Sequence, residues 1–323
     1  MTTCADISIV IVNYNTLSLL RDCLTSLMAS EAKLCEIIVV DNASADGSAD
    51  MVRSDFPAVV VLQNDHNAGF PRANNWGMRM AKNKFILMLN SDTLVRPEAL
   101  NRMLSFLDSH PEVGGVTCRL FNADGSIQAS ISKRPGPVLL MFRLLGFSRL
   151  VSGDRARRWL GRYFGFLLGR TVRSYLAPYV TREAPIEIEN TSGACLLLRR
   201  EVLDTVGMLD EQIFMYFEDM DYCMRIRQAG WKLYYLPQAE VVHLVGASSG
   251  GRMRGYSLQS YRALFYFYRK HFSFPILLAA RAMVLATSTL RWLGNWIAGA
   301  FSQNAVYRQN RSDLKQVILV CFD

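Results

Sequence analysis

Small polar and acidic residues end three apolar runs in the first hundred residues of the chain. Each run is long enough for a strand buried on both faces, as in a parallel sheet. Side chains at the carboxyl ends of such strands lie where open α/β sheets bind ligands. The polar residues are Asn13 and Tyr14 after Ile7–Val12, Asp41 and Asn42 after Glu36–Val40, and Asn90, Ser91 and Asp92 after Phe85–Leu89.

The chemistry of these side chains suits a nucleotide that carries a diphosphate. The Asp41 carboxylate can accept the imide N–H of uracil or thymine, and the Tyr14 ring can stack on the base. The hard oxygen ligands of Asp92 suit Mg²⁺ or Mn²⁺. Each residue also has a structural alternative, because Asp41 and Asp92 can cap a helix or a turn, and Tyr14 can pack in the core.

Two sequence patterns that would indicate other nucleotide-binding classes are absent from the chain. No GxGxxG follows the first apolar run, and no GxxxxGK[ST] occurs anywhere. These absences argue against a dinucleotide-dependent dehydrogenase and against a P-loop enzyme.

A second acidic group, Glu218, Asp219 and Asp221, lies in the last third of the chain. A carboxylate of this kind can act as a general base that takes a proton from an attacking hydroxyl. The structural alternative is that all three acids begin a helix, where negative charge is favoured. Asp221 stands four residues before Arg225, which predicts an ion pair on such a helix.

Alternating apolar runs and helical patterns predict the elements that position these residues. The β-α-β-α-β-α-β order of residues 7–89 predicts a doubly wound α/β sheet with its ligand loops on one edge. Beyond it we expect a helix over Pro97–Ser109 and a helix over Arg199–Val206. Further strands are expected at Val113–Leu120, Leu196–Leu198, Trp231–Leu236 and Glu240–Val245, with Ile127–Ser132 completing a hairpin after the Asp124-Gly125 turn.

The size and the cysteines of the chain are consistent with a cytoplasmic protein. Its 323 residues can bury a large core in one or two domains. The seven cysteines form no CxxC pair, and scattered thiols fit a reducing compartment. The first residues show neither the basic start nor the apolar stretch of a signal peptide.

The net charge of +8 is concentrated in two segments that are also rich in aromatic and aliphatic residues. Eleven Lys and Arg stand against one acid between Lys133 and Arg182, and six against none between Arg252 and Arg281. This mixture favours an anionic membrane surface as partner, and no nucleic acid is expected. A solvated basic face is the alternative.

The basic segments predict an amphipathic helical insertion at about 135–184 and membrane-associated helices at the C-terminus. No apolar run in the insertion reaches the roughly 18 residues of a spanning helix, so it should lie on the membrane or cover an acceptor. Ile276–Ala300 is apolar but contains Arg281 and Arg291. Because charges in mid-span are costly, we expect this helix to lie in the membrane interface. A spanning hairpin, or burial against the rest of the protein, are the alternatives.

At this point the motifs can be compared with a known family. The chain resembles the family 2 glycosyltransferases, which have the GT-A fold, and among them the bacterial rhamnosyltransferase-type members. The resemblance covers about residues 7–250 and implies a Rossmann-like mixed sheet flanked by helices in a catalytic domain at 1–250. The C-terminal amphipathic region expected from its residue pattern then occupies 251–323. It rests on residues 10–15, 40–44, 67–70, 73–77, 89–92, 192–195 and 214–221.

The resemblance also implies roles for residues that bind the nucleotide sugar. Asp41 would recognise the base, and Asn42 stands where many relatives have a second Asp. Asn90-Ser91-Asp92 replaces the family's DxD motif, so Asp92 would carry most of the metal contact. Gly69 would let the backbone approach the sugar, and Arg72 would pair with phosphate unless it forms a surface salt bridge. The full expected set is Asn13, Tyr14, Asp41, Asn42, Asn67, Gly69, Arg72, Asn74, Ser91 and Asp92.

The remaining implied roles concern catalysis and the metal. Asp219 would be the general base, with Glu218 supporting the acceptor. His243 would join Asp92 on the metal, and a neutral imidazole suits Mn²⁺ better than Mg²⁺. A structural histidine on an apolar strand is the alternative.

These expectations combine into a metal-dependent inverting glycosyltransferase on the inner face of the plasma membrane. The resemblance favours dTDP-L-rhamnose as donor and a lipid-linked or growing saccharide as acceptor. A UDP-hexose or UDP-galactofuranose donor is the enzymatic alternative. A non-catalytic membrane-binding or saccharide-binding protein on the same scaffold is the alternative from another class.

Overall fold

The computed structural model describes residues 6–32, 36–132, 136–144, 183–244, 258–300 and 305–323. The chain forms two compact units. The first comprises Met1–Lys133, Ala177–Phe214 and Glu218–Met253, and the second comprises Arg134–Leu176, Met215–Phe217 and Arg254–Asp323. Most of the expected insertion at about 135–184, and the expected domain boundary at residue 250, lie outside the described residues.

The first unit is built on a mixed sheet in which six of the eight strands along its main path run in the same direction. The strand order is β3-β2-β1-β4-β11-β6-β12-β5, with β7 added beside β6 and β9 beside β12. Only β11 and β5 run against the others on this path. The strands are β1 (Ile7–Asn13), β2 (Glu36–Asp41), β3 (Val60–Gln63), β4 (Phe85–Asn90), β5 (Thr93–Val95), β6 (Val113–Phe121), β7 (Ile127–Gln128), β9 (Ile186–Glu187), β11 (Cys195–Arg199) and β12 (Lys232–His243).

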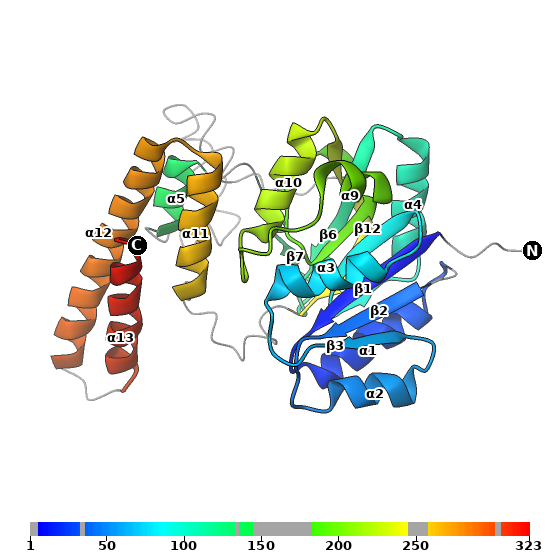
Figure 1. Cartoon of the computed structure of the whole chain (residues 1–323), viewed down its shortest axis with the longest axis horizontal. Coiled ribbons are helices and arrows are strands. Elements are labelled where there is room, and N and C mark those ends of the chain that lie inside the picture. Colours follow the sequence, from blue (N-terminus) through cyan, green and yellow to red (C-terminus); the bar gives the residue numbers. More distant parts are fainter. Residues whose placement is uncertain (1–5, 33–35, 133–135, 145–182, 245–257, 301–304) are drawn as a thin grey trace, which may run out of the picture. The chain divides into compact units, whose positions relative to one another are not determined.

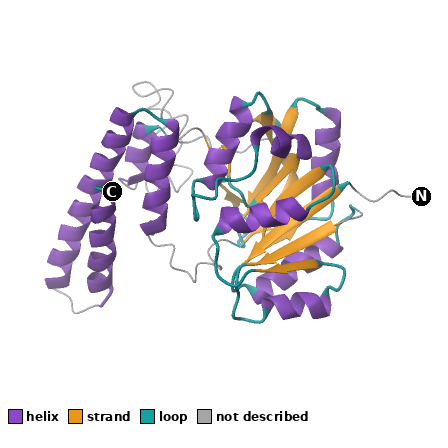
Figure 2. Cartoon of the chain, viewed as in Figure 1, coloured by secondary structure: helices purple, strands orange, loops and turns teal. Residues whose placement is uncertain are grey.

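Helices cover both faces of this sheet (Figure 2), because the central strands are apolar on both sides. Ile9 and Ile11 of β1 pack into one core with α1 and α4, whereas Val10 packs into a second core with α3 and α10. This alternation follows from the period of two along a strand. The helices are α1 (Leu17–Met28), α2 (Ser48–Asp55), α3 (Phe70–Met80), α4 (Ala99–Ser109), α9 (Arg200–Val206) and α10 (Glu218–Gln228).

The strand directions bring the carboxyl ends of six strands to one edge of the sheet. β1, β2, β3, β4, β6 and β12 end there at Asn13, Asp41, Gln63, Asn90, Phe121 and His243. The doubly wound sheet with polar loops on one edge is therefore confirmed. The β12–β5 pairing places His243 opposite Thr93, which directly follows Asp92.

Two expected strand assignments are wrong in detail. The two strands expected at Trp231–Leu236 and Glu240–Val245 are one strand, β12, with an irregularity between Leu236 and Glu240 that absorbs the intervening residues. The expected hairpin partner Ile127–Ser132 is divided. Its first two residues pair with β6, whereas β8 (Ile131–Ser132) pairs with β10 (Asn190–Thr191) in a separate small sheet.

The second unit consists of helices in its described part: α5 (Pro137–Leu144), α11 (Leu258–His271), α12 (Phe274–Ala300) and α13 (Ala305–Val320) (Figure 1). One side of α12 is buried through Leu277, Ala280, Val284 and Ser288. Its two arginines contact neighbouring helices, since Arg281 lies over the Phe265 ring and Arg291 donates to the Leu144 carbonyl. Among the described helices, α12 is long and apolar enough to cross a membrane, judged by length and composition.

Candidate functional site

Asn13, at the end of β1, connects three of the predicted loops through its side chain. Its Nδ2 donates to Asp41 Oδ1 and to Ser44 Oγ, each at 3.0 Å. Its Oδ1 accepts a hydrogen bond from Thr16 Oγ1, and that hydroxyl lies 3.0 Å from Ser91 Oγ. The loops after β1, β2 and β4 are thus held together as the sequence predicts.

Asp41 and Tyr14, the two residues expected at the base, differ in exposure. Asp41 is fully buried, and its second oxygen accepts a hydrogen bond from the Ser44 backbone N–H at 3.0 Å. Tyr14 is 39% exposed, which leaves its ring free to stack on a ligand. Recognition of a base by either residue stays a prediction.

Asn42 organises the neighbouring loop with both atoms of its amide. Its Oδ1 accepts from Asn64 Nδ2 at 2.9 Å and from the Ala68 backbone N–H at 3.0 Å. Its Nδ2 donates to Asn67 Oδ1 at 2.8 Å, and the same oxygen accepts from the Gly69 N–H. An aspartate carboxylate has no proton to donate to Asn67, so the amide at position 42 fits this chain's own loop.

Gly69, Arg72 and Asn74 make protein contacts that account for their residue types. A Cβ at Gly69 would lie 2.7 Å from the Phe214 carbonyl oxygen, so its close approach is to the protein's own backbone. Arg72 Nε lies 3.4 Å from Glu211 Oε2, so Arg72 forms the surface salt bridge that was the expected alternative to phosphate binding. Asn74 is buried and donates to the Phe70 carbonyl of its own helix. Sugar or phosphate contacts of these residues stay predictions.

Asp92, His243 and Asn90 come together at the shared sheet edge. His243 Nε2 lies 3.2 Å from Asp92 Oδ1 and 3.3 Å from Asn90 Nδ2. The other imidazole nitrogen, Nδ1, lies 2.8 Å from Gln128 Oε1. Asn90 Oδ1 is buried, and no donor among the described residues reaches it.

These three residues fit a divalent cation. A buried carbonyl oxygen without a donor is a ligand available to a hard cation, and so are the Asp92 carboxylate and an imidazole nitrogen. Neighbouring ligands in an octahedral shell with bonds of about 2.1 Å lie about 3 Å apart, close to the Asp92–His243 separation. No group of three or more His, Cys, Asp or Glu side chains with metal-ligand spacing occurs in the described chain.

Glu218 and Asp219 begin α10 after two consecutive residues, Tyr216 and Phe217, in left-handed backbone conformations. Glu218 is 7% exposed, and its Oε2 has no hydrogen-bond donor within the described residues. Burial, together with the Asp219 charge, raises the pKa of Glu218 to about 8. Asp219 Oδ2 accepts a hydrogen bond from the Gly193 backbone N–H at 3.3 Å, which ties it to the loop before β11.

Asp221 has a different role from the two acids before it. It is fully buried and pairs with Arg225 Nε at 2.8 Å, as the i,i+4 spacing predicts. The Arg225 guanidinium also donates to the carbonyls of Val206 and Met208. Asp221 therefore holds the guanidinium through which Arg225 anchors α10 to the chain that precedes it.

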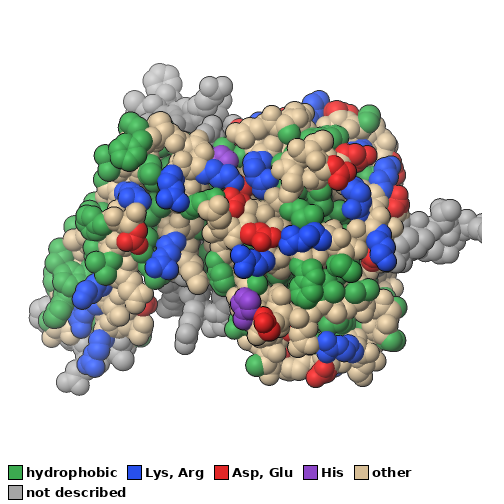
Figure 3. All heavy atoms as spheres, viewed as in Figure 1, with side chains coloured by type: hydrophobic (Ala, Val, Ile, Leu, Met, Phe, Trp, Pro, Cys, Tyr) green, Lys and Arg blue, Asp and Glu red, His purple; other side chains and the backbone are tan. Residues whose placement is uncertain are grey.

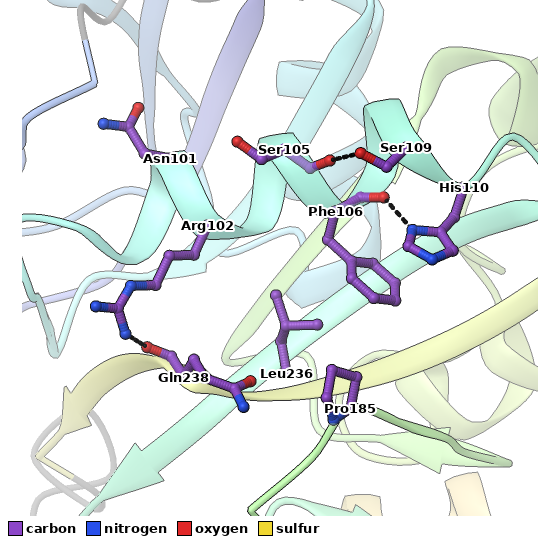
Figure 4. Close-up of a pocket in the computed structure, with 9 residues that line it drawn as sticks. All are labelled: Asn101, Arg102, Ser105, Phe106, Ser109, His110, Pro185, Leu236 and Gln238. Carbon is purple, nitrogen blue, oxygen red and sulfur yellow. Dashed lines mark hydrogen bonds between the residues drawn. The ribbon is translucent and has the colours of Figure 1, made fainter.

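A groove of about 430 Å³ lies apart from these residues, against α4 and the middle of β12 (Figure 4). Apolar side chains, Phe106, Pro185 and Leu236 among them, provide much of its lining. None of the expected site residues lines it. We therefore assign it no part in the site.

Comparison with known proteins identifies the family. The family model described as Glycosyl transferase family 2 matches residues 8–207, and a second one, Glycosyltransferase like family 2, matches residues 188–254. The chain belongs to glycosyltransferase family 2. It is accordingly an enzyme, and the matched residues include the loops, Asp92, the Glu218-Asp219 pair and His243.

Two curated relatives are named as rhamnosyltransferases. The chain is 29% identical to an N-acetylglucosaminyl-diphospho-decaprenol L-rhamnosyltransferase of Mycobacterium tuberculosis over 255 residues, which cover 75% of this chain and 77% of the relative. It is 23% identical to a dTDP-rhamnosyl transferase of Shigella flexneri, with 87% of this chain and 86% of the relative covered.

Solved structures with the GT-A fold resemble this family 2 glycosyltransferase. A mannosyltransferase of Pyrobaculum calidifontis, in complex with GDP-Man and Mn²⁺, superimposes with a TM-score of 0.54 at 19% identity, covering 98% of this chain and 86% of that one. A GalNAc-T7 structure with UDP, GalNAc and Mn²⁺ gives a TM-score of 0.56 at 16% identity, and the match covers 83% of this chain and 50% of that one. These similarities establish the fold.

Sequence reasoning missed two parts of this glycosyltransferase's site. Gln128, which contacts His243, was expected only as a strand residue. Asn90 was expected as a weakened position of the DxD motif, whereas its amide nitrogen lies 3.3 Å from His243 Nε2 and its buried carbonyl oxygen meets no donor within the described residues. The Asp124-Gly125 turn predicts that the chain reverses and pairs with β6. It does not predict that β12 also pairs with β6, which is what brings His243 close to Gln128.

Proposed function

We propose that the enzyme transfers L-rhamnose from dTDP-L-rhamnose, with inversion, to a lipid-linked or growing saccharide acceptor. The two relatives named as rhamnosyltransferases support the donor sugar. The Asp92–His243–Asn90 cluster is the observation that carries the proposal, because it brings a carboxylate, an imidazole and an amide together beside the polar loops, and the amide oxygen meets no donor among the described residues.

Residues of the three loops would bind the nucleotide. Asp41 would accept the base N–H, which requires the Asp41–Ser44 turn to release one of its oxygens, and the exposed Tyr14 ring would stack on the base. Asp92, His243 and Asn90 would hold Mg²⁺ or Mn²⁺. When bound, such an ion neutralises charge on the departing nucleoside diphosphate.

The two acids at the start of α10 would divide the proton chemistry. The acceptor oxygen bonds to the anomeric carbon, the bond from that carbon to the diphosphate oxygen breaks with its electron pair, and Asp219 takes the hydroxyl proton. The raised pKa of Glu218 keeps this neighbour protonated near neutral pH, so only one negative charge has to be held there. Asp219 is then the acid of the pair that would act as the general base.

Donor turnover in two variants tests this assignment. Asp219→Asn should lower kcat by about 10²- to 10⁴-fold with little change in KM for the donor, because only the proton acceptor is removed. Asp92→Ala should abolish the stimulation of turnover by Mn²⁺. The matched control Asp204→Asn changes an exposed acid on α9 and should leave turnover unchanged. If both site variants retain wild-type, metal-stimulated turnover, the catalytic proposal is wrong.

The donor is tested separately with a thermal-shift panel of dTDP-, UDP- and GDP-sugars in the presence of Mn²⁺. A ligand that binds only the folded state raises its stability, so dTDP-L-rhamnose should raise Tm most. A larger shift with UDP-hexose or UDP-galactofuranose would replace the proposed donor and leave the reaction class intact.

We also propose that the enzyme works in the cytoplasm, on the inner face of the plasma membrane. An apolar stripe of exposed residues runs along α12, and green side chains along the helical unit are visible in Figure 3. The arginines of α12 contact other helices, so this stripe carries no charge. The stripe consists of Phe274, Leu278, Ala282, Ala286, Leu290, Leu293 and Ile297.

A further inference from the structure

We propose that Gln128 is a positioning residue that keeps the His243 proton on Nδ1, so that the Nε2 lone pair faces Asp92 and Asn90. The use of that lone pair for a cation rests on the proposed function. The orientation of the imidazole does not depend on it, because it follows from hydrogen bonds within the chain.

The hydrogen bonds leading to Gln128 start at a carboxylate and can run in only one direction. Asp124 Oδ1 lies 2.6 Å from Ser126 Oγ, and since an ionised carboxylate only accepts, the serine hydroxyl must donate to it. Ser126 Oγ must therefore accept from Asn122 Nδ2, 2.8 Å away. This turns the Asn122 carbonyl oxygen toward Gln128.

Gln128 then has a single amide orientation that satisfies its neighbours. Its Nε2 lies 2.8 Å from Asn122 Oδ1 and 3.4 Å from the His243 backbone carbonyl oxygen, and both of these atoms only accept. The amide nitrogen must face them, which leaves Oε1 facing His243 Nδ1 at 2.8 Å. Because Oε1 cannot donate, the hydrogen of this bond belongs to Nδ1.

A proton on Nδ1 determines what the other imidazole nitrogen, Nε2, can bind. With the proton on Nδ1, neutral His243 presents a lone pair at Nε2 to the Asp92 carboxylate oxygen 3.2 Å away. Two acceptors at this distance repel one another, and a cation between them converts the repulsion into two favourable contacts. A partner that fixes the tautomer and ring orientation of a histidine in this way typically changes metal affinity by about 10- to 100-fold.

The fold explains why Gln128 reaches this position. The Asp124-Gly125 turn reverses the chain after β6, and β7 then pairs with β6, with Gln128 opposite Leu120. β12 lies on the other side of β6 and ends at His243. A short turn thus supplies the contact from a segment that is distant in sequence from both Asp92 and His243.

Nitrogen-15 NMR of histidine-labelled enzyme, at alkaline pH and without metal, reads the tautomer directly. A His243→Gln variant identifies the signal among the four histidines. Wild-type enzyme should show a protonated Nδ1 and a bare Nε2. Gln128→Met, which removes the acceptor, should give a mixture of tautomers, whereas Gln128→Glu, which keeps one, should preserve the wild-type signal.

The second measurement is the affinity for Mn²⁺, which is determined from the decrease in the electron paramagnetic resonance signal of free Mn²⁺ as it binds. Gln128→Met should weaken binding by about 10- to 100-fold, and Gln128→Glu should restore most of it. Gln238→Met, the same substitution at an exposed glutamine of β12, is the matched control and should bind as wild type does.

The outcomes separate this proposal from the proposed function. A wild-type His243 signal with bare Nδ1, or an unchanged tautomer in Gln128→Met, overturns the positioning role. If Asp92→Ala weakens Mn²⁺ binding but a folded Gln128→Met does not, the positioning role is again wrong and the metal site stands. If Asp92→Ala binds Mn²⁺ as wild type does, the metal site itself is wrong, and the tautomer measurement still decides the role of Gln128.

Discussion

Glu218 is a buried acid that directly precedes a second acid, Asp219. It is buried at the start of α10 next to Asp219, and its Oε2 meets no donor among the described residues. A charged carboxylate in such surroundings is costly, and therefore the proton is retained. The adjacent acids therefore differ in the roles proposed for them, since Glu218 retains its proton and Asp219 is the proposed base.

The raised pKa of Glu218 predicts a specific dependence of stability on pH. Burial and the Asp219 charge raise this pKa from 4.5 to about 8, so the folded state holds the proton more tightly than the unfolded chain. The stabilisation is fully present below about pH 4.5 and is lost as pH rises through about 8. Across this window, the free energy of unfolding of wild type should fall relative to Glu218→Gln by up to about 1 kcal/mol per pH unit.

Urea unfolding at a series of pH values measures this difference. Glu201→Gln, at an exposed glutamate on α9, serves as the control and should follow the wild-type slope. Parallel curves for wild type and Glu218→Gln would show that Glu218 titrates as an ordinary glutamate.

At the scale of elements, the turn into α3 depends on one tight backbone contact. Gly69 has φ +87° and ψ 163°, a region that is essentially restricted to glycine. The next residue, Phe70, donates its N–H to the Phe214 carbonyl at 2.9 Å. The loop before α3 is therefore packed directly on the segment that leads to Glu218 and Asp219.

Gly69→Ala should destabilise the enzyme more than the same change at Gly207. Gly207 has a similar backbone, φ +80° and ψ −168°, but a Cβ there meets nothing within 4 Å. Its replacement should cost about 1–3 kcal/mol from backbone strain alone. Gly69→Ala adds a Cβ 2.7 Å from the Phe214 carbonyl oxygen, so a further loss of at least about 1 kcal/mol is expected in urea unfolding. Equal losses would show that the contact with Phe214 is easily relieved.

The sequence predicted those elements whose patterns are local and strong. Alternation of apolar runs with helical spacing located β1, β2, β4 and α1, and strand direction then implied that Asn13, Asp41 and Asp92 lie at one edge. The sequence did not predict that β11 enters between β4 and β6, or that β12 continues past Leu236 as one strand. Both depend on pairings between residues far apart in the chain, which a local pattern does not encode.

The same limit explains what was missed in the site. The residue type of Asp92 suits a metal by itself, and the family resemblance adds His243. Gln128, in contrast, contacts His243 only because β7 and β12 both pair with β6. Conversely, residues expected at the ligand, such as Gly69 and Asn74, have identifiable structural tasks. A polar residue in a loop can thus be required by the fold and still be available to a ligand.

For the whole molecule, the exposed apolar stripe of α12 and the positive net charge bear on the proposed association with a membrane. The stripe on α12 continues for the full length of a 27-residue helix, whereas Arg281 and Arg291 contact neighbouring helices. The helix α13, which packs against α12, carries basic residues such as Arg308 and Arg311. This combination fits the proposed association of the enzyme with an anionic membrane interface.

Leu290→Asp combined with Ile297→Asp should therefore release the enzyme from anionic vesicles. Both side chains are exposed, at 69% and 65%, so the changes should leave the helical content measured by circular dichroism intact. Burying either side chain in the interface is worth roughly 1.5–3 kcal/mol, so the pair should weaken cosedimentation at least about 100-fold. The control, Val60→Asp with Met80→Asp, adds the same charge at exposed positions of the first unit and should bind almost as wild type does. Binding by wild type that disappears in moderate salt, with no effect of the α12 substitutions, would instead indicate attraction by the basic residues alone.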